Sequence, residues 1–496
     1  MSKVLVLYPN QLFRIEELPE DISRIILIEE PLYFGNDKQY PSLFHRQKLV
    51  MHRASMRRYV KEVLWPAGYE VDYIEHTTVE DSSIVVSRSE DADELIIFDV
   101  VDDILRRRLN DAANTQGRPI IWLDNPNFYL TRVEVLTKFS GSKMPVFVEF
   151  YKWQRERFDI LLTTSYKPAG NKLMHDSEVV ARVPIDKQLP GFTVFGDNEF
   201  ISEAIEYINR CMSDNYGAIE QVPWPTNHAE AESWLNDFIE HRLANSGMYR
   251  EAVEENMPWL FHGALSASLN IGLLSPKQIV HTALRYHETH KISLNSLEPF
   301  IRDILGWREY YRGIYESNHA KLRTSNAFEN TRKLSDDWYS ATTGLPPLDS
   351  AIRNLYTRAY VHEAERTDIL GSVMLMCEID PKAVYQFFNE MMIDGYDWLT
   401  VPRVYGFSQC ADGGSMAKLI PLYPSSNIIA RSHYPKEGWC DVWDGLYARF
   451  VMTNSAILQR NPDMRIVLRN VERINEDRKR IIGYRAEDFL NTKTTV

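Results

Sequence analysis

The chain has 496 residues, and 56 Lys and Arg residues against 69 Asp and Glu residues give it a formal net charge of −13. This length predicts more than one domain, and a composition that is 44% hydrophobic and 25% charged excludes a disordered or fibrous chain. No apolar run approaches the roughly 18 residues that a membrane-spanning helix needs, so we expect a soluble protein without membrane association. The first residues form neither a signal peptide nor a transit segment, which predicts a cytoplasmic location.

Short runs rich in Val, Ile and Leu alternate with amphipathic stretches in residues 1–130. The predicted strands are 3–9, 23–31, 69–76, 94–101 and 119–124. Predicted helices at 44–68 and 102–117 separate some of these strands, which implies right-handed βαβ units and a mostly parallel, doubly wound sheet. Such a sheet binds ligands at the carboxyl ends of its strands. Neither G-x-G-x-x-G nor G-x-x-x-x-G-K-[ST] occurs there, so we expect no common dinucleotide or triphosphate site in this domain.

The pattern changes twice after this segment. Residues 131–232 are looser in pattern and richer in turn residues, and we interpret them as an interdomain connection. Residues 233–496 show helical spacing of apolar residues almost throughout. The predicted fold class is therefore an N-terminal α/β domain with a doubly wound parallel sheet, followed by an all-α domain.

Cysteine is sparse and widely spaced. The four cysteines are Cys211, Cys377, Cys410 and Cys440, with no C-x-x-C pair among them. This spacing supports neither a disulfide framework nor a zinc site, so we predict no metal site. The acidic net charge argues against indiscriminate binding to nucleic acid, although a local basic groove stays compatible with it.

Three helical segments concentrate aromatic, Arg, His and Asp residues. They are 307–316, 360–366 and 394–414. Any one of them alone is compatible with an aromatic core stripe. Together with His362, Arg366, Asp394 and Asp397 they predict a large, partly apolar pocket with a few convergent polar groups, which suits a planar aromatic cofactor.

Several of these segments carry a resemblance to a known family. Residues 259–275, 300–316, 343–366 and 403–414 resemble the photolyase/cryptochrome superfamily. Within it, the chain is most similar to the bacterial and archaeal deoxyribodipyrimidine photolyase-related branch, which contains the iron–sulfur (6-4) photolyases and cryptochromes. Residues 44–60 and 146–157 resemble the N-terminal half of the same branch. The resemblance implies the photolyase architecture, with a U-shaped FAD buried in a helical FAD-binding domain at 233–496 and an antenna-type domain at 1–130.

The resemblance also implies which residues hold the FAD. The segment from His262 to Ser266 matches the T-S-x-L-S element, with Ser266 as the retained hydroxyl at a helix start that could hold the pyrophosphate. Arg366 and Asp394 match the pair beside the flavin ring, and a buried arginine is tolerable only with such a partner. The implied FAD contacts are Tyr249, His262, Leu265, Ser266, Asn270, Arg308, Arg366, Asp394 and Asp397.

The resemblance implies that three residues act on the substrate, namely Trp307, His362 and Glu363. Trp307 matches the wall on which a flipped base stacks, and Arg308 follows it in the same W-R pair. The Y-x-H-H segment of (6-4) photolyases reads Tyr360-Val361-His362-Glu363, so the first histidine is retained and the second is a glutamate. A desolvated Glu363 would have a raised pKa and could donate a proton, but it would also repel an anionic flavin and DNA phosphate.

Aromatic residues are also implied in electron transfer. They are Trp338, Tyr339, Tyr396 and Trp398, and an ordinary core role stays open for each of them. The cluster cysteines of the iron–sulfur branch correspond to Pro347, Pro435, Gly438 and Cys440. Because a cluster needs thiolate ligands, which proline and glycine do not offer, we predict no iron–sulfur cluster.

The antenna pocket of the branch commonly holds 6,7-dimethyl-8-ribityllumazine. The G-D-Q-L start of the branch reads Pro9-Asn10-Gln11-Leu12 here, so the loop is altered. Both a bound antenna and an empty pocket therefore stay open.

The implied function is a blue-light-dependent DNA photolyase, a carbon–carbon lyase. It would repair pyrimidine dimers in UV-damaged DNA, with (6-4) photoproducts as the first candidates, by electron transfer from reduced FAD to a flipped lesion. The alternative is a cryptochrome-like photoreceptor without repair activity that signals to an unknown protein partner, which Glu363, the lost cluster cysteines and the charge of −13 favour. A third hypothesis is a light-independent flavoprotein that keeps only the fold of this family. We expect a monomer.

Overall fold

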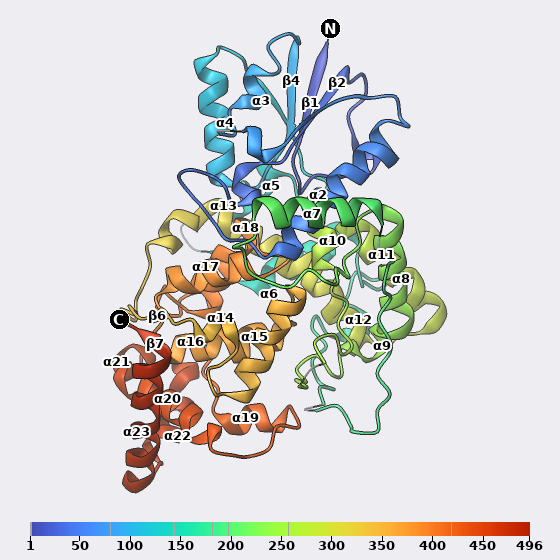
Figure 1. Ribbon diagram of the computed structural model, residues 1–496. Coiled ribbons are helices and arrows are strands. Elements are labelled where there is room, and N and C mark those ends of the chain that lie inside the picture. Colours follow the sequence, from blue (N-terminus) through green and yellow to red (C-terminus); the bar gives the residue numbers. More distant parts are fainter. Residues whose placement is uncertain are drawn as a thin grey trace. The chain divides into compact units, whose positions relative to one another are not determined.

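The computed structural model describes residues 2–79, 81–141, 144–180, 182–196, 198–255, 257–417 and 419–496 (Figure 1). The chain divides into two compact units. Unit one comprises Met1–His175, Gly191–Ala244 and Gly263–Ser317. Unit two comprises Asp176–Pro190, Asn245–His262 and Asn318–Val496.

A five-stranded parallel sheet forms the core of the N-terminal part of unit one (Figure 1). Its strands are β1 (Lys3–Leu7), β2 (Arg24–Ile28), β3 (Glu70–Ile74), β4 (Glu94–Phe98) and β5 (Ile120–Leu123), in the order β3-β2-β1-β4-β5. Residues 4–7 and 25–28 are buried, as expected for inner strands of a sheet that is covered on both faces. The five predicted strands and the predicted parallel, doubly wound sheet are confirmed.

The connections between strands explain where a ligand could bind this sheet. Helix α2 (Arg46–Tyr59) and the π-helical turn η2 (Val60–Leu64) join β2 to β3, and α4 (Asp103–Thr115) joins β4 to β5. After β3 the chain returns to place β4 beside β1, so the strand order reverses between these two strands. In doubly wound sheets, ligands bind at the carboxyl edge where such a reversal occurs. Here that edge is formed by the residues that follow β1 and β4.

The rest of unit one is helical. Its further helices are α1 (Pro31–Phe34), α3 (Ile84–Ser87), α5 (Arg132–Phe139), α6 (Phe147–Phe158), α7 (Glu199–Cys211), α8 (His228–His241), α10 (Ser266–Asn270), α11 (Pro276–His290), α12 (Leu294–Ile301) and the π-helical turn η5 (Arg302–Arg308). The segment interpreted as a connection, residues 131–232, thus contains α5, α6 and α7. Helices α9 (Leu243–Ser246) and α13 (Glu309–Arg323) each span a boundary between the units.

Unit two is almost entirely helical, in agreement with the predicted all-α character of the C-terminal part. Its helices are α14 (Asp337–Ser340), α15 (Pro346–Arg358), α16 (Ser372–Met376), α17 (Pro381–Met391), α18 (Asp397–Val401), α19 (Ser425–Ala430), α20 (Trp439–Thr453), α21 (Ser455–Leu458), α22 (Arg465–Glu472) and α23 (Glu476–Lys493). The π-helical turns η6 (Glu365–Gly371) and η7 (Pro402–Ser408) interrupt this series. The short strands β6 (Lys333–Leu334) and β7 (Thr494–Thr495) pair antiparallel and tie the C-terminal end to the unit. Within the described ranges, no helix is both long enough and apolar enough to cross a membrane.

Candidate functional site

Arg366 and Asp394 form a buried ion pair in unit two, as the resemblance implies. Arg366 lies in η6, and its Nη2 donates to both carboxylate oxygens of Asp394, at 2.9 and 3.1 Å. Asp394 is buried, and so is most of the Arg366 side chain. The remaining Nε of Arg366 is buried without a hydrogen-bond partner among the described residues. The pair therefore presents one unused donor in an interior position.

Two histidine rings stack beside this pair in the same unit. The rings of His262 and His362 lie 4.3 Å apart between centroids and are inclined by only 11°. The backbone N–H of Arg366 donates to the carbonyl of His362 at 2.9 Å, which places the histidine one helical turn before the arginine. His362 is fully buried, whereas His262 is partly buried with its Nε2 enclosed. Neither this Nε2 nor either ring nitrogen of His362 has a hydrogen-bond partner in the described part of the chain.

Glu365 lies against the His362 ring and was missed by the sequence analysis. Its Oε2 is 3.4 Å from His362 Nε2, and its Oε1 accepts a hydrogen bond from Asn354 Nδ2 at 3.2 Å. Both Glu365 and Asn354 are buried. The only signal in the sequence was the spacing of three between His362 and Glu365, which places two residues on the same side of a helical turn.

Burial controls the protonation of this cluster. Desolvation raises the pKa of Glu365 to about 8, against smaller opposing effects of the hydrogen bonds from Asn354 and from His362. Desolvation also lowers the pKa of His262 to about 4, helped by the charge of Arg250. The pKa of His362 falls well below its ordinary value through desolvation, with further contributions from His262, Arg431 and Arg366. At neutral pH the glutamic acid is therefore protonated and both imidazoles are neutral.

Glu363 does not occupy the desolvated position that we considered for it. Its side chain is 61% exposed, forms an ion pair with Arg403 and accepts a hydrogen bond from Thr367 at 2.7 Å. The burial that would raise the pKa of a glutamate beside His362 is found two residues later, at Glu365. The difference arises because a helical turn directs neighbouring side chains to different sides.

Asp397 begins α18 and is held by two other side chains. Arg323 pairs with its carboxylate, and the hydroxyl of Tyr385 donates to Oδ1 at 2.6 Å. Tyr396 and Trp398, which flank it, are both buried. Of the other aromatic residues implied in electron transfer, Trp338 is fully buried in α14 and donates its Nε1 proton to the carbonyl of Lys493 at 2.8 Å. Tyr339 packs its ring 5.5 Å from Phe387.

Tyr249 belongs to a small apolar cluster of unit two. Its ring stacks on Phe261 with centroids 5.1 Å apart, and both residues pack with Val183, Ala252 and Leu260. This environment does not by itself point to a cofactor contact.

The other implied FAD contacts lie in unit one. Ser266 is the first residue of α10, and Leu265 precedes it in a buried position. Asn270, at the end of α10, accepts a hydrogen bond from Arg308 through its Oδ1. Arg308 also donates from Nε to the carbonyl of Asn127 at 3.2 Å. Asn270 and Arg308 are thus brought together, both buried.

Trp307 is part of an aromatic cluster in unit one. It lies in η5 and stacks on Phe147 with centroids 3.7 Å apart and an angle of 11°. Tyr311 lies 5.5 Å from it in a second stacked contact, and Tyr310 meets it edge-on at 5.9 Å. Trp307 is only partly buried, so part of the indole surface stays accessible.

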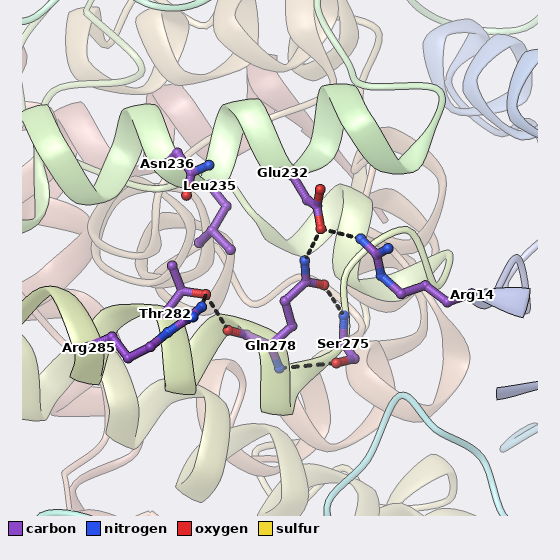
Figure 2. Close-up of a pocket in the computed structure, with 8 residues that line it drawn as sticks. All are labelled: Arg14, Glu232, Leu235, Asn236, Ser275, Gln278, Thr282 and Arg285. Atoms are coloured by element: carbon purple, nitrogen blue, oxygen red, sulfur yellow. Dashed lines mark hydrogen bonds and ion pairs between the residues drawn. The ribbon is translucent and has the colours of Figure 1, made fainter. Parts of the chain in front are cut away.

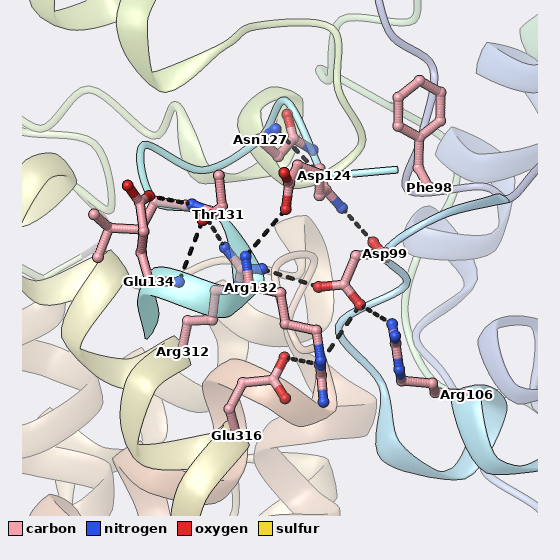
Figure 3. A network of polar contacts seen from close by, with 12 residues as sticks. Phe98, Asp99, Arg106, Asp124, Asn127, Thr131, Arg132, Glu134, Arg312 and Glu316 are labelled. Atoms are coloured by element: carbon pink, nitrogen blue, oxygen red, sulfur yellow. Dashed lines mark hydrogen bonds and ion pairs between the residues drawn. The ribbon is translucent and has the colours of Figure 1, made fainter. Parts of the chain in front are cut away.

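An ion network fixes the end of β4 against α13 (Figure 3). Asp99 follows β4 and binds Arg106 at 2.6 Å and the buried Arg312 at 2.9 Å. Arg132 approaches Asp99 at 3.6 Å and pairs with Glu316 at 2.5 Å. The carbonyl of Asp99 accepts from Asn125 Nδ2 at 2.8 Å. Because every charge in this network is paired, we assign it a structural role.

Buried polar atoms gather at the carboxyl edge of the sheet. Tyr8 Oη and Asn10 Oδ1 follow β1, and Glu30 Oε2 follows β2. These atoms and both ring nitrogens of His76 have no hydrogen-bond partner in the region that the structure describes. Desolvation raises the pKa of Glu30 to about 7 and lowers the pKa of His76 to about 4. Tyr8 and Asn10 lie beside the point where the strand order predicts a ligand, whereas Glu30 and His76 follow the neighbouring strands β2 and β3.

A surface pocket of about 420 Å³ lies between α8 and α11 (Figure 2). Glu232 at its centre accepts hydrogen bonds from Arg14 and from Gln278, the latter at 2.7 Å. None of the implied site residues lines it. It is therefore not our candidate site, in spite of its size.

The cysteines are separate free thiols. Cys377, Cys410 and Cys440 are buried, and Cys211 is exposed. In the described ranges, no group of three or more His, Cys, Asp and Glu side chains could hold a metal ion.

Comparisons with known proteins agree with this architecture. Residues 4–224 match the family model described as deoxyribodipyrimidine photo-lyase-related protein. The chain is 29% identical over 476 residues to a (6-4) photolyase of Agrobacterium fabrum, which covers 90% of this chain and 91% of that protein.

Solved structures share the fold over nearly the whole chain. A bacterial class III photolyase from Agrobacterium tumefaciens superposes with a TM-score of 0.57 at 16% identity, covering 99% of this chain and 98% of that one. An archaeal photolyase from Sulfolobus tokodaii, solved with two FAD molecules, gives a TM-score of 0.54 at 13% identity, covering 98% and 100%. The chain is therefore related to the deoxyribodipyrimidine photo-lyase-related branch of the photolyase/cryptochrome superfamily, whose family model matches residues 4–224.

Proposed function

We propose that this protein is a blue-light-dependent flavoprotein of the photolyase type that repairs pyrimidine dimers in UV-damaged DNA. The observation that carries the proposal is the buried pair of Arg366 and Asp394, joined to the stacked histidines His262 and His362. The (6-4) photolyase that is similar over 90% of the chain supports the same activity.

The unpartnered atoms of this cluster fit a bound polar cofactor. A buried polar atom without a partner costs about 1–3 kcal/mol, and native proteins rarely leave several of them together. His262 Nε2, both ring nitrogens of His362, Glu365 Oε2 and Arg366 Nε are all in this condition within the described residues. FAD carries ring, ribityl and phosphate groups that could satisfy them, and its ring could pack on the imidazoles.

Reduced FAD, when bound, would supply the electron that light drives onto the lesion. The chain's own residues would set the environment for that transfer. Asp394 balances the positive charge of Arg366 and fixes its guanidinium, which stabilises negative charge nearby. His262 and His362 are neutral, so they add no charge that would compete with the guanidinium of Arg366.

The remaining implied FAD contacts stay part of the proposal. They are Tyr249, Leu265, Ser266, Asn270, Arg308 and Asp397, and Trp338, Tyr339, Tyr396 and Trp398 stay the proposed electron-transfer aromatics. The proposed substrate contacts are Trp307, whose partly accessible indole would stack on a flipped base, together with His362 and Glu363.

An antenna chromophore is proposed at the carboxyl edge of the sheet. Tyr8, Asn10, Glu30 and His76 offer buried polar atoms there that lack partners within the described chain. A heteroaromatic ring such as that of 6,7-dimethyl-8-ribityllumazine could accept and donate hydrogen bonds at these atoms. We also propose that the protein holds no iron–sulfur cluster, because Pro347, Pro435 and Gly438 replace thiolate ligands.

A cryptochrome-like photoreceptor is the second candidate. Glu363 favours it, because an exposed carboxylate paired with Arg403 stands where (6-4) photolyases have a second histidine. Such a protein would bind FAD and respond to light through a protein partner without selecting damaged DNA. The proposed monomer and the cytoplasmic location apply to both candidates.

Binding to damaged DNA separates the two candidates. The purified full-length protein would be denatured to release and identify its flavin, and then titrated with duplexes that carry a (6-4) photoproduct, a cyclobutane dimer or no lesion, at several salt concentrations. We expect FAD, a preference for one lesion duplex, and an affinity that falls steeply as salt rises. Equal weak binding to all three duplexes would count against the repair function.

A further inference from the structure

Four side chains form a continuous row in unit two, and all of them except His262 are buried. Asn354 Nδ2 donates to Glu365 Oε1 at 3.2 Å, Glu365 Oε2 lies 3.4 Å from His362 Nε2, and the His362 ring stacks on His262 at 4.3 Å. They come from α15, η6, the residues that precede η6, and the turn that ends at His262. The row ends at ring nitrogens that have no partner in the described chain. Only the Asn354 end of the row is held by a hydrogen bond.

The charges around the row determine where its proton resides. Arg366 and Arg431 act on His362, and both disfavour an imidazolium there. Tyr360 and Tyr434 are close enough to interact with Glu365, and burial raises the pKa of both phenols, so each stays neutral. Arg366 is paired with Asp394, and Arg431 with Asp368. The surroundings therefore favour a neutral row with a single acidic proton, on Glu365.

We propose that Glu365 stores the proton that His362 delivers to the bound pyrimidine lesion, and that His262 and Asn354 hold the two partners in line. The proposal rests on the proposed repair function and names further residues for it. His362 is the residue that would touch the substrate. Glu365, His262 and Asn354 act through it and are positioning residues.

The proton transfer balances without any further reactant. His362 receives the carboxyl proton at Nε2, so it carries its own proton on Nδ1 before the transfer. A lesion that has accepted an electron is an anion, and one of its oxygens takes the Nδ1 proton while the Glu365 O–H bond breaks and the Nε2–H bond forms. Glu365 is left as a carboxylate and the protonated lesion has lost its negative charge. When the electron leaves the repaired base, the proton returns by the reverse path.

This row supplies what the replaced histidine would otherwise provide. General acid catalysis needs a donor that keeps its proton at the working pH and lies within reach of the acceptor. Glu363 is 61% exposed and forms an ion pair with Arg403. Glu365 is buried and directed at His362.

The first test locates the proton by infrared spectroscopy, independently of activity. We would compare the carboxylic acid stretching region of the wild-type holoprotein, Glu365→Gln and Glu437→Gln near neutral pH. Glutamine can keep the bond from Asn354 but cannot titrate, and Glu437 is an exposed glutamate of the same unit that serves as the matched control. We expect a protonated-carboxyl band in wild type and in Glu437→Gln that Glu365→Gln lacks. Identical bands in wild type and Glu365→Gln would overturn the proposal.

The second test measures repair after single flashes across a pH series. General acids contribute about 10²–10⁴ to a rate, so we expect Glu365→Gln to lose at least about tenfold in repair yield at neutral pH. Wild type should lose yield as Glu365 ionises at higher pH, and the variant should not follow that profile. Wild-type yield and pH profile in Glu365→Gln would contradict the delivery of its proton.

The two tests also separate the proposal from the function on which it rests. If wild type repairs neither lesion but shows the band, the repair function fails and the proton store stands. If the band is absent, the proton store fails whatever the repair result. Should Glu365→Gln not fold, Glu365→Asp keeps a carboxyl one methylene shorter, and it should shift the band and retain part of the yield. An unshifted band in Glu365→Asp would then overturn the proposal.

Discussion

Asp394 balances the charge of the largely buried Arg366 side chain. Removing one partner of a buried pair leaves the other charge uncompensated and costs about 3–5 kcal/mol. We therefore expect Asp394→Asn to lower the free energy of unfolding by this amount and to reduce the FAD recovered with the protein. Urea unfolding and the flavin content after denaturation measure the two effects.

The matched control is an acidic partner at the surface. Asp441 pairs with Arg478 at 2.6 Å, and both side chains are more than one third exposed. Exposed pairs contribute at most about 1 kcal/mol, so Asp441→Asn should leave stability and flavin content nearly unchanged. Equal behaviour of the two variants would show that the pair at Arg366 is not the cofactor's neighbour.

Glu365 predicts a decline in stability with rising pH. Its pKa is about 8 in the folded protein, whereas an unfolded glutamate releases its proton near about 4.3. The folded state binds the extra proton across this window, so the stabilisation is complete below the lower value and is lost as pH rises through the upper one. His262 and His362 act in the opposite direction, but only below about pH 6.5.

Between pH 6.5 and 8 the two histidines no longer titrate, and the comparison with Glu365→Gln separates Glu365 from other groups that titrate there, such as Glu30. Across this interval, wild type should lose about 2 kcal/mol of unfolding free energy relative to Glu365→Gln, which binds no proton there. Urea unfolding of both proteins at several pH values in this interval measures the difference. Parallel stability curves would show that Glu365 is ionised throughout.

A role could be assigned to a single residue from the sequence only where that residue belongs to a recognisable local motif. Arg366 and Asp394 were found because they match the pair that the family resemblance implies, and the structure pairs them. Glu365 was missed because its burial depends on α15, which supplies Asn354 from outside the motif. The stack of His262 on His362 joins residues 100 positions apart and has no periodic signal.

At the scale of elements, two of the four π-helical turns among the described residues, η5 and η6, contain candidate residues. Trp307 and Arg308 lie in η5, Arg366 lies in η6, and η7 covers residues 402–408. Such turns are rare in proteins and occur often at functional sites. A hydrophobic pattern predicts a helix there but not the extra residue in a turn, so the orientation of these side chains could not be derived from the sequence. The strands were predictable because continuous Val, Ile and Leu runs have few alternatives in a covered sheet.

Helices α20 and α23 approach closely at a glycine. A Cβ at Gly445 would lie 2.1 Å from the carbonyl oxygen of Ile482, whereas a Cβ at Gly483 in α23 would meet nothing within 4 Å. Gly445→Ala must therefore push the helices apart, at a cost of about 1–3 kcal/mol. Gly483→Ala should instead stabilise α23 by about 0.5–1 kcal/mol, because glycine is a poor helix former.

Thermal melting of the two glycine variants tests this packing. We expect a lower melting temperature for Gly445→Ala and an unchanged or higher one for Gly483→Ala. The same sign for both variants would contradict the close approach of α20 and α23.

For the whole molecule, composition correctly indicated an ordinary globular chain but could not choose a function. The net charge of −13 leans toward signalling but cannot decide the function, because DNA binding depends on where the basic residues lie. The fold narrows the choice to a superfamily that contains both activities, since a fold does not fix a function. The choice between repair and signalling depends on whether the cluster around Arg366, His362 and Glu365 acts on a DNA lesion.

Light-driven repair tests this central claim most directly. The flavin-loaded protein would be mixed with oligonucleotides carrying either a (6-4) photoproduct or a cyclobutane dimer, and intact strands would be counted after blue light and after darkness. We predict that at least one lesion is restored in the light and neither in the dark. Photoreduction of the flavin without restoration of either lesion would contradict the account and favour a photoreceptor.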